Sequence, residues 1–460
     1  MILMWMRLSR FALFGLVIAT VLFLIQYRLY VRARRHLQAM GVSPLGQRRV
    51  LLILRVLLLI MNLPWVIGIG GSLLLDWSLF SSWERLGSWA SYVVYPFAVW
   101  QYGSVIAFVV LVVLDVVRMI WRWSRAALRF LGRWPRSMAA VPPQPEGGAG
   151  TSPEQLTVTA SYSAPHGHGQ GPEERPSGQE SRLLLSRRRF IQTAGVSIAT
   201  LPYIASAYGA IQAADQFVIE RVDIPLPNLP DALVGLTIVH LTDIHVGPFM
   251  SEERWREYVR VVNRLEPDLI VLTGDYVASS ARSAIPFVRG AAELRARYGV
   301  FGSLGNHDRF TEAVPLLVEG FARHGMKILY NEQVWVRTPG GRINLIGIDY
   351  IGQSGRGFAR ALRGLRLEGP SILLSHQPNV FPQAAGRAID LTLAGHTHGG
   401  QMVADLAGIR LSPARLITPY VAGLYEHGGA KLYVSRGLGT TGPPVRLNAP
   451  PEITLIRLVR

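Results

Sequence analysis

Side chains that can bind metal ions recur in five short blocks along the C-terminal half of this 460-residue chain. In chain order the blocks are Asp243-Ile244-His245, Gly274-Asp275, Gly305-Asn306-His307-Asp308, Ser375-His376 and Gly395-His396-Thr397-His398. Carboxylate, amide and imidazole groups supply oxygen and nitrogen ligands, which suit hard or borderline divalent metals. A thiolate ligand is excluded because the chain contains no cysteine.

The spacing of these residues predicts a two-metal hydrolytic centre. An apolar run typical of a β-strand precedes each block, so the ligands are expected on loops at strand ends, where α/β folds place their sites. One residue separates Asp243 from His245, and an extended backbone would point both side chains at one cation. Asp275 has two carboxylate oxygens and can bridge two metals. Such a pair lowers the pKa of a bridging water, so that hydroxide exists near neutral pH.

The hydrophobic pattern from Phe217 onward predicts the elements that position these loops. Strands are expected at 236–241, 269–272, 300–304, 328–330, 334–336, 343–348, 372–374 and 391–393, and helices at 252–265, 284–297 and 313–324. Strands that alternate with helices and are followed by further strands favour an α/β fold, with sheets packed together and helices outside.

The five blocks resemble the motifs of the calcineurin-like metallophosphoesterase superfamily. The segments 395–401 and 432–446 are similar to an exported, membrane-associated branch of bacterial phosphoesterases that carries a twin-arginine signal. The resemblance covers roughly 233–458 and implies a four-layer α/β/β/α sandwich. It leaves unexplained the three long apolar stretches within residues 1–130.

The resemblance also implies a role for each residue. One metal would be held by Asp243, His245, Asp275 and His398, and the other by Asp275, Asn306, His376 and His396. His307 would bind neither metal and would face the substrate, with Asp308 orienting its ring. The alternative for His307 is a core histidine whose ring is satisfied by Asp308. Mn²⁺, Zn²⁺ and Fe²⁺ are all compatible with these ligands.

Three further residues bear on the site. Ala278 stands where purple acid phosphatases carry a tyrosine ligand, which disfavours an iron–tyrosinate pair. Arg436 and Arg446 flank a loop rich in glycine and threonine, and guanidinium groups beside such a loop could hold a phosphoryl group. A surface turn with solvated arginines is an equally good interpretation.

Long apolar stretches in the first half predict a membrane region. Hydrophobic residues make up 49% of the chain and the mean hydropathy is +0.25. Residues 1–130 are expected to hold three spans, and a fourth is expected farther on; the four stretches are Phe11–Tyr27, Val56–Leu75, Tyr92–Leu114 and Phe190–Ala214. Arginines cluster after the first and third spans, which predicts that those loops are cytoplasmic and that residues beyond the fourth span lie outside.

The segment between the third and fourth spans carries two predicted features. Residues 131–185 are rich in proline, glycine, serine and glutamate, and are expected to form a disordered cytoplasmic linker. Residues 186–214 begin with Ser186-Arg-Arg-Arg-Phe-Ile-Gln192, which resembles a twin-arginine export signal, and Ala205-Ser-Ala207 resembles a cleavage site. The alternative is an ordinary span with a basic cytoplasmic flank.

These observations favour a membrane-tethered hydrolase of phosphoric esters, with a catalytic domain at 215–460 on the outer, periplasmic face of the inner membrane. Its expected partners are the membrane, the twin-arginine export machinery and a phosphoester substrate, which its location suggests is lipid-borne or envelope-linked. The net charge of +17 comes largely from arginines beside apolar stretches, so no nucleic-acid partner is expected. The main alternative is a membrane sensor or scaffold that binds phosphorylated ligands without turnover. A transporter is disfavoured because the spans carry few polar residues beyond Asn62 and Asp115.

Overall fold

A computed structural model describes residues 2–74, 89–131, 200–213, 216–350, 356–363, 369–406, 409–442 and 444–460. The chain separates into two compact units, one formed by Met1–Val109 with Val196–Arg460 and the other by Val110–Gly195. The predicted linker, the twin-arginine-like segment and the start of the fourth span lie outside the described residues. The domain boundaries drawn from the sequence stay predictions.

Three long helices form the N-terminal part, as the apolar stretches predicted: α1 (Ile2–Ala39), α2 (Pro44–Leu74) and α3 (Trp89–Leu131). Each contains a stretch long and apolar enough to cross a membrane, at Gly15–Ala39, Pro44–Ile67 and Tyr95–Arg129. Their polar residues serve helix packing. Gln26 Nε2 donates to Gln101 Oε1 at 2.7 Å, and Asn62 Nδ2 donates to Gln26 Oε1 at 2.6 Å. Side-chain amides that pair across helices in this way hold apolar helices together.

The first sheet carries three of the five metal-binding blocks. It has six strands in the order β1-β14-β2-β3-β4-β5. Their bounds are β1 (Val218–Pro225), β14 (Glu452–Val459), β2 (Thr237–Leu241), β3 (Leu269–Thr273), β4 (Val300–Ser303) and β5 (Lys327–Ile328). Strands β2 to β5 run parallel, while β14 is antiparallel to β2. The carboxyl ends of β2, β3 and β4 therefore meet along one edge.

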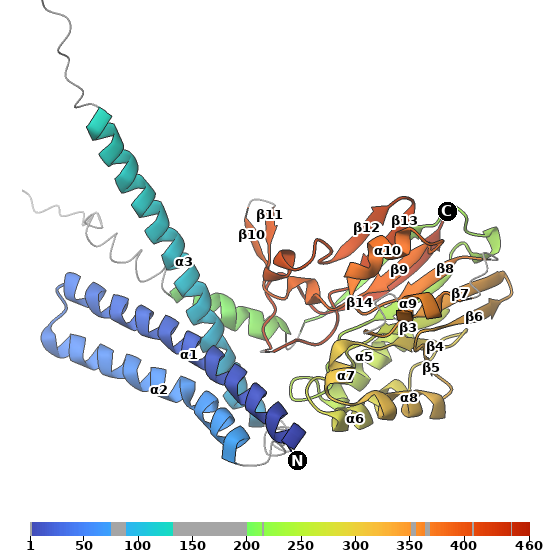
Figure 1. Cartoon of the computed structure of the whole chain (residues 1–460), viewed down its shortest axis with the longest axis horizontal. Helices are drawn as coiled ribbons and strands as arrows, with labels where there is room; N and C mark the ends of the chain where they lie inside the picture. Colours follow the sequence, from blue (N-terminus) through green and yellow to red (C-terminus); the bar gives the residue numbers. More distant parts are fainter. Residues whose placement is uncertain are drawn as a thin grey trace, which may run out of the picture. The chain divides into compact units, whose positions relative to one another are not determined.

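The second sheet carries the other two blocks, in the order β12-β13-β9-β8-β7-β6. The bounds are β12 (Gly423–His427), β13 (Ala430–Val434), β9 (Leu391–Ala394), β8 (Ser371–Leu374), β7 (Gly341–Gly347) and β6 (Glu332–Thr338). Strands β13, β9, β8 and β7 are parallel. A separate hairpin is formed by β10 (Ala404–Leu406) and β11 (Ile409–Leu411). In Figure 1 this hairpin projects from the two-sheet region at the end away from β6.

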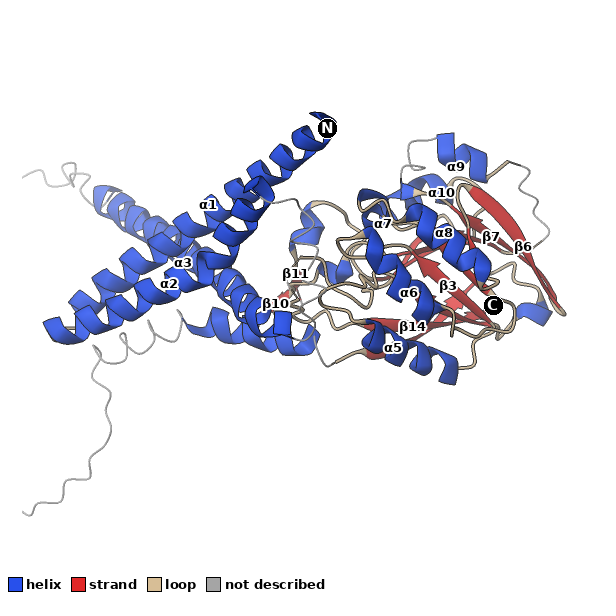
Figure 2. Cartoon of the chain, turned by 90° about the horizontal axis from the view of Figure 1, so that it is seen from below, coloured by secondary structure: helices blue, strands red, loops and turns tan. Residues whose placement is uncertain are grey.

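Hydrophobic clusters join the two sheets to each other and to the helices. Buried residues of both sheets, such as Ile238 and Leu374, form one cluster. Three helices cover the first sheet: α5 (Glu252–Arg264), α6 (Ala284–Ala291) and α8 (Val314–Arg323). Helices α9 (Arg356–Ala361) and α10 (Phe381–Ala385) pack on the second. Figure 2 shows the red strands between α5 on one side and α9 and α10 on the other. The predicted mixed α/β class is confirmed.

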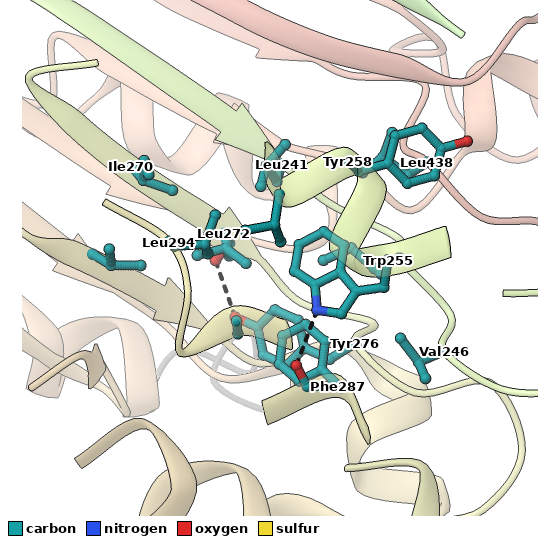
Figure 3. Packing of buried hydrophobic residues seen from close by; sticks show 14 of the residues in the cluster. Leu241, Val246, Trp255, Tyr258, Ile270, Leu272, Tyr276, Phe287, Leu294 and Leu438 are labelled. Carbon is teal, nitrogen blue, oxygen red and sulfur yellow. Dashed lines mark hydrogen bonds between the residues drawn. The ribbon is translucent and has the colours of Figure 1, made fainter. Parts of the chain in front are cut away.

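A stack of aromatic rings fixes the helices on the first sheet (Figure 3). The rings of Tyr276 and Phe287 are stacked with centroids 4.7 Å apart, and Trp255 Nε1 donates to the Phe287 carbonyl at 2.9 Å. The hydroxyl of Tyr276 donates to the carbonyls of Leu272 and Ser303. Tyr276 therefore belongs to the core of the domain.

The structure corrects one predicted helix and adds elements that the sequence pattern missed. The helix predicted at 284–297 ends at Ala291. Beyond it, Asn263 takes over the backbone hydrogen bonds, because its side chain donates to the Glu293 carbonyl and accepts from the Arg295 amide. Strands β1, β12, β13 and β14 and the hairpin were not predicted. Of the fourth span, the structure describes a helix over residues 200–213.

Candidate metal centre

All seven predicted metal ligands follow the carboxyl ends of strands. Asp243 and His245 follow β2, and Asp275 follows β3. Asn306 starts the short helix α7 (Asn306–Phe310) after β4. His376 follows β8, and His396 and His398 follow β9. Three groups of side chains lie close enough to hold an ion, with ligand atoms within 4.8 Å of one another; they are Asp243/His245/His398, Asp243/Asp275/His376 and His245/Asp275/His307. The two sheets thus bring distant parts of the chain to one point.

The backbone around the ligands is left-handed, which corrects the extended geometry expected for Asp243 and His245. Their φ angles are 51° and 52°, and those of Asp275, His396 and His398 are also positive. This region costs an L-residue about 1–2 kcal/mol. The conformation is held by neighbouring loops, because the Asp243 amide donates to the Gly274 carbonyl and the His245 amide donates to the Asp275 carbonyl, both at 3.0 Å.

Asp243 directs one carboxylate oxygen at the first predicted metal position. Its Oδ2 accepts hydrogen bonds from the Thr242 hydroxyl at 2.8 Å and the His396 amide at 2.9 Å. Its Oδ1 is buried without a hydrogen-bond partner. That oxygen lies 3.3 Å from Nε2 of His398 and 3.9 Å from Nε2 of His245. A buried carboxylate oxygen surrounded by imidazole nitrogens has the donor set that a divalent cation requires.

Asp275 lies between the two predicted ligand sets. Its Oδ1 accepts from the His307 amide at 2.8 Å. Its Oδ2 lies 3.6 Å from Nε2 of His245, a ligand of the first set, and 3.2 Å from Nε2 of His376, a ligand of the second. Gly305 allows this approach, because a β-carbon there would lie 2.1 Å from Asp275 Oδ1.

The second predicted ligand set adds Asn306, His376 and His396 to Asp275. Asn306 Oδ1 is buried with no hydrogen-bond partner, which fits a neutral oxygen ligand. His376 donates from Nδ1 to the Thr273 carbonyl at 2.8 Å, so its Nε2 faces the centre. Nδ1 of His396 lies 3.1 Å from that nitrogen. The donor chemistry of the three residues fits a metal ion, and of the two histidines His376 is the one that belongs to a group of close ligand atoms among the described residues, with Asp243 and Asp275.

His307 and Asp308 differ from their predicted pairing. The ring of His307 is oriented by the Ala278 carbonyl, which lies 2.6 Å from Nδ1. Asp308 is buried, and its carboxylate accepts from the backbone amides of Gly305, Asp275 and Tyr276 at 2.8–2.9 Å. The prediction that Asp308 orients His307 was therefore wrong. Asp308 instead ties the β3 and β4 loops together, which positions Asp275.

Arg436 and Arg446 are both engaged inside the protein, which contradicts their predicted role in holding a phosphoryl group. Arg436 forms ion pairs with Glu220 at 2.8 Å and with Glu452 at 2.9 Å. Arg446 is completely buried, and its guanidinium donates to the carbonyls of Gly439 and Ala449 among others. It also lies 3.2 Å from Nδ1 of His398. The two arginines hold the loop beside the first metal position.

Thr441 is a site residue that the sequence did not reveal. Its hydroxyl lies 2.7 Å from Nε2 of His398 and 3.2 Å from Nε2 of His245. The signal available in the sequence was the loop rich in glycine and threonine between Arg436 and Arg446, which drew attention to backbone amides rather than to this hydroxyl. Together with the half-buried rings of His307 and His396, exposed Thr441 borders the opening of the site.

The buried environment sets the protonation of the ligands. Burial lowers the pKa of His245 to about 3 and that of His396 to about 4. Burial, with the nearby charges of His245 and Arg446, lowers the pKa of His398 well below its ordinary value. These rings are neutral at physiological pH, as metal ligands must be. His376 is the exception, because Asp275 and Asp243 outweigh burial and raise its pKa to about 10.

Metal binding is therefore expected to release a proton from His376 and to weaken as the pH falls. Below pH 10 this proton is present in the metal-free protein and competes with the ion, so affinity should rise about tenfold per pH unit between about pH 7 and pH 9. Burial also raises the pKa of Asp243 to about 6, so the slope should steepen below that pH. Chelator competition across this pH range measures the slope. A pH-independent affinity would contradict the assignment of His376 as a ligand.

Comparison with known proteins supports the same chemistry. The Calcineurin-like phosphoesterase family profile matches residues 236–400, which include all seven ligands. A zebrafish (Danio rerio) protein described as "Transmembrane protein with metallophosphoesterase domain" is 35% identical over 285 residues, covering 58% of this chain and 63% of its own length. The corresponding Bos taurus protein is 34% identical, with 55% and 60% covered. The chain thus spans about three fifths of the length of these two relatives.

A third relative is matched over its whole length. "Phosphodiesterase YaeI" from Escherichia coli K12 is 30% identical over 279 residues, covering 60% of this chain and 100% of the relative. Among solved structures, a dimetal phosphatase from Danio rerio aligns with 49% of this chain and 94% of its own, at 12% identity and a TM-score of 0.32. The profile match over the ligand blocks and the full-length match to the Escherichia coli relative show that this chain belongs to the calcineurin-like phosphoesterase family.

Proposed function

We propose that this protein hydrolyses phosphoric esters with a dinuclear metal centre and acts outside the cytoplasm. The observation that carries the proposal is the position of Asp275 Oδ2, within 3.6 Å of nitrogen atoms from both ligand sets. When bound, two divalent ions supply a bridging hydroxide near neutral pH and neutralise charge on the phosphoryl oxygens. Mn²⁺, Zn²⁺ and Fe²⁺ all suit the nitrogen and oxygen donors present.

The residues around the centre have different roles in the proposed reaction. Asp243 and Asp275 each use one oxygen to fix the backbone of a neighbouring loop and leave the other facing the centre. His307 stands beside them, with its ring centroid 4.7 Å from that of His245. Because Nδ1 of His307 donates to the Ala278 carbonyl, Nε2 is directed away from that contact, and a ring that carries a second proton, on Nε2, would give it to a leaving oxygen and become neutral.

Replacing His307 with glutamine is expected to lower turnover by about 10²–10⁴-fold while both metal ions stay bound, because general acids contribute that much. The loss should be larger for an alkyl phosphoester than for a nitrophenyl ester, whose leaving group needs no proton. Turnover of both esters and metal content by mass spectrometry are the measurements. Loss of a metal ion from the variant would instead make His307 a ligand, as its place near His245 and Asp275 allows.

The overall proposal is tested with the full chain in detergent micelles. Metal-free protein should be inactive toward nitrophenyl phosphate and bis-nitrophenyl phosphate, and should regain activity when Mn²⁺, Zn²⁺ or Fe²⁺ is added. The two esters separate a monoesterase from a diesterase. Full metal occupancy without turnover of either ester or of a wider panel would favour the alternative, a membrane sensor or scaffold that only binds phosphorylated ligands.

Location outside the cytoplasm is supported by charge. Arginines are abundant at the end of α1, with Arg32, Arg34 and Arg35, at the start of α2, with Arg48 and Arg49, and in the last part of α3, and such residues remain on the cytoplasmic side. In the proposed multi-pass topology in the inner membrane, the N-terminal end of α3 and residues beyond 214 lie on the opposite side. Export by the twin-arginine machinery is part of the proposal, and replacing Arg187 and Arg188 with lysine should leave residues 215–460 inside. Protease accessibility of this region in spheroplasts measures the outcome.

A further inference from the structure

An exposed apolar segment lies beside the metal centre. It comprises residues 409–417, formed by β11 and the short helix η8 (Pro413–Leu416), and is called the 409–417 segment below. The side chain of Leu416 is 90% exposed, that of Ile417 79% and that of Leu411 49%. Soluble surfaces rarely place such large aliphatic groups together in water, so a cluster of this kind marks a contact surface.

The 409–417 segment is built onto the loop that carries two metal ligands. Gly400, two residues after His398, packs so closely on Ser412 that a β-carbon there would lie 2.6 Å from the Ser412 side chain. Arg410 donates to the Asn448 carbonyl at 2.7 Å, and Asn448 donates to the Val403 carbonyl at 2.9 Å. These contacts tie the segment to the loop that follows His398.

The same corner of the catalytic domain contacts the membrane helices. Met402 and Val445 share a hydrophobic cluster with Ala98 of α3 and with Ala210 of the helix at 200–213. The amide of Arg446, whose guanidinium supports His398, donates to the Gly209 carbonyl at 2.8 Å. The candidate span of α3 begins at Tyr95, so these contacts lie at the end of a membrane-spanning helix.

The helix at 200–213 presents a second apolar surface. Leu201, Ile204, Tyr208 and Ile211 are each more than half exposed, and their spacing of three and four residues puts them on one face. The opposite face holds Gly209 and Ala210, which pack on the catalytic domain and on α3. A helix with one face on protein and the other apolar and uncovered is suited to lipid.

The charges of the 409–417 segment favour a bilayer as its occupant. Arg410 and Arg415 are exposed, and each directly precedes an exposed aliphatic residue, Leu411 or Leu416. Cationic side chains beside protruding leucine and isoleucine match the two layers of a membrane surface, because the aliphatic groups enter the acyl region while the guanidinium groups meet lipid phosphates.

We propose that the 409–417 segment rests on the membrane and holds the metal centre at the lipid headgroups, and that the substrate is a phosphoester carried by a lipid of that membrane. The substrate part rests on the proposed function, whereas the membrane contact does not. A headgroup phosphate would reach the opening bordered by Thr441 and His307 without leaving the bilayer surface. In this arrangement the ligands, which lie at the ends of strands, are kept close to the membrane surface by the connection of the catalytic domain to the spanning helices.

The membrane contact is tested with a spin label, since the absence of native cysteines allows a single attachment site. The full chain carrying Leu416→Cys is labelled and reconstituted into vesicles of phosphatidylethanolamine and phosphatidylglycerol. Leu316→Cys on α8 is the matched control, being another exposed leucine of the catalytic domain. Oxygen, which enters the bilayer, is expected to increase the relaxation rate of the label at 416. A water-soluble nickel chelate is expected to increase the relaxation rate of the control label at 316. Equal exposure to the chelate would overturn the proposal, as would spin–spin broadening at 416, which would identify a second copy of the chain as the occupant.

The substrate class is tested by turnover in the same vesicles. The double variant Leu416→Ser, Ile417→Ser should hydrolyse phosphatidic acid or phosphatidylglycerol at least about tenfold more slowly than the unmodified chain, because two aliphatic anchors are lost. Hydrolysis of the soluble nitrophenyl esters should stay within about twofold of the original rate. If the unmodified chain hydrolyses soluble esters but neither lipid, the lipid-substrate proposal fails alone. If it hydrolyses neither class, the proposed function fails, and the spin label still reports on the membrane contact.

Discussion

Replacing Asp275 with asparagine is expected to remove bound metal and to lower turnover of nitrophenyl esters by about 10³-fold or more. Its Oδ2 lies 3.6 Å from Nε2 of His245 in the first set and 3.2 Å from Nε2 of His376 in the second. Asparagine keeps an oxygen for the His307 amide, so the loop geometry should persist. What is lost is the negative charge that offsets two divalent ions, and a factor of 10³ corresponds to about 4 kcal/mol of transition-state stabilisation. Metal content by mass spectrometry and turnover of both nitrophenyl esters are the measurements.

Asp308→Asn is the matched control, because Asp308 is also a fully buried carboxylate. It lies three residues after Gly305, the residue that packs against Asp275. Its oxygens accept only backbone amides, so an amide group there leaves one N–H unsatisfied at a cost of about 1–3 kcal/mol. This variant should melt at a lower temperature and still bind metal at 25 °C. If Asp275→Asn retained both ions and normal turnover, the bridging assignment would be wrong and the dinuclear centre with it.

The identity of the ligands could be predicted from the sequence, but the geometry of their backbone could not. Residue type and spacing identified Asp243 and His245 because metal chemistry restricts which side chains can serve. An extended backbone was expected between them, whereas both residues are left-handed. That conformation depends on carbonyls of the β3 loop, about 30 residues away in the chain. Local propensity contains no information about such a partner, and it disfavours the conformation that the partner stabilises.

The roles of the charged residues near the ligands were harder to predict for a related reason. Arg436 was expected to meet a phosphoryl group, yet its partners are Glu220 on β1 and Glu452 on β14. Neither strand was predicted, so neither carboxylate could be placed beside the arginine. Asp308 was assigned to His307 on the family resemblance, while the backbone amides that donate to it belong to two different loops. Motifs indicate which residues matter, and only the fold shows what each one contacts.

Replacing Arg446 with methionine is expected to destabilise the domain by at least about 3 kcal/mol and to weaken metal binding at the first position. The guanidinium is buried among backbone carbonyls, including those of Gly439 and Ala449, and methionine would leave several of them unpaired at about 1–3 kcal/mol each. Its position 3.2 Å from Nδ1 of His398 couples the loop to a metal ligand. Thermal unfolding of the metal-free chain and Mn²⁺ titration of the folded protein measure the two effects.

The same variant decides between a structural and a substrate-binding role for Arg446. A residue that held the phosphoryl group would, when replaced, raise KM and weaken inhibition by inorganic phosphate while stability and metal affinity stayed unchanged. Replacing a residue that supports the loop would instead lower stability and metal affinity and leave KM unchanged. The loss of stability appears even without metal, because the buried carbonyls lose their hydrogen-bond donor in the metal-free fold. Excess Mn²⁺ should then restore most of the lost turnover, with KM close to its original value. Rescue by metal follows from the coupling to His398, since saturating the first position offsets a weakened ligand loop by mass action.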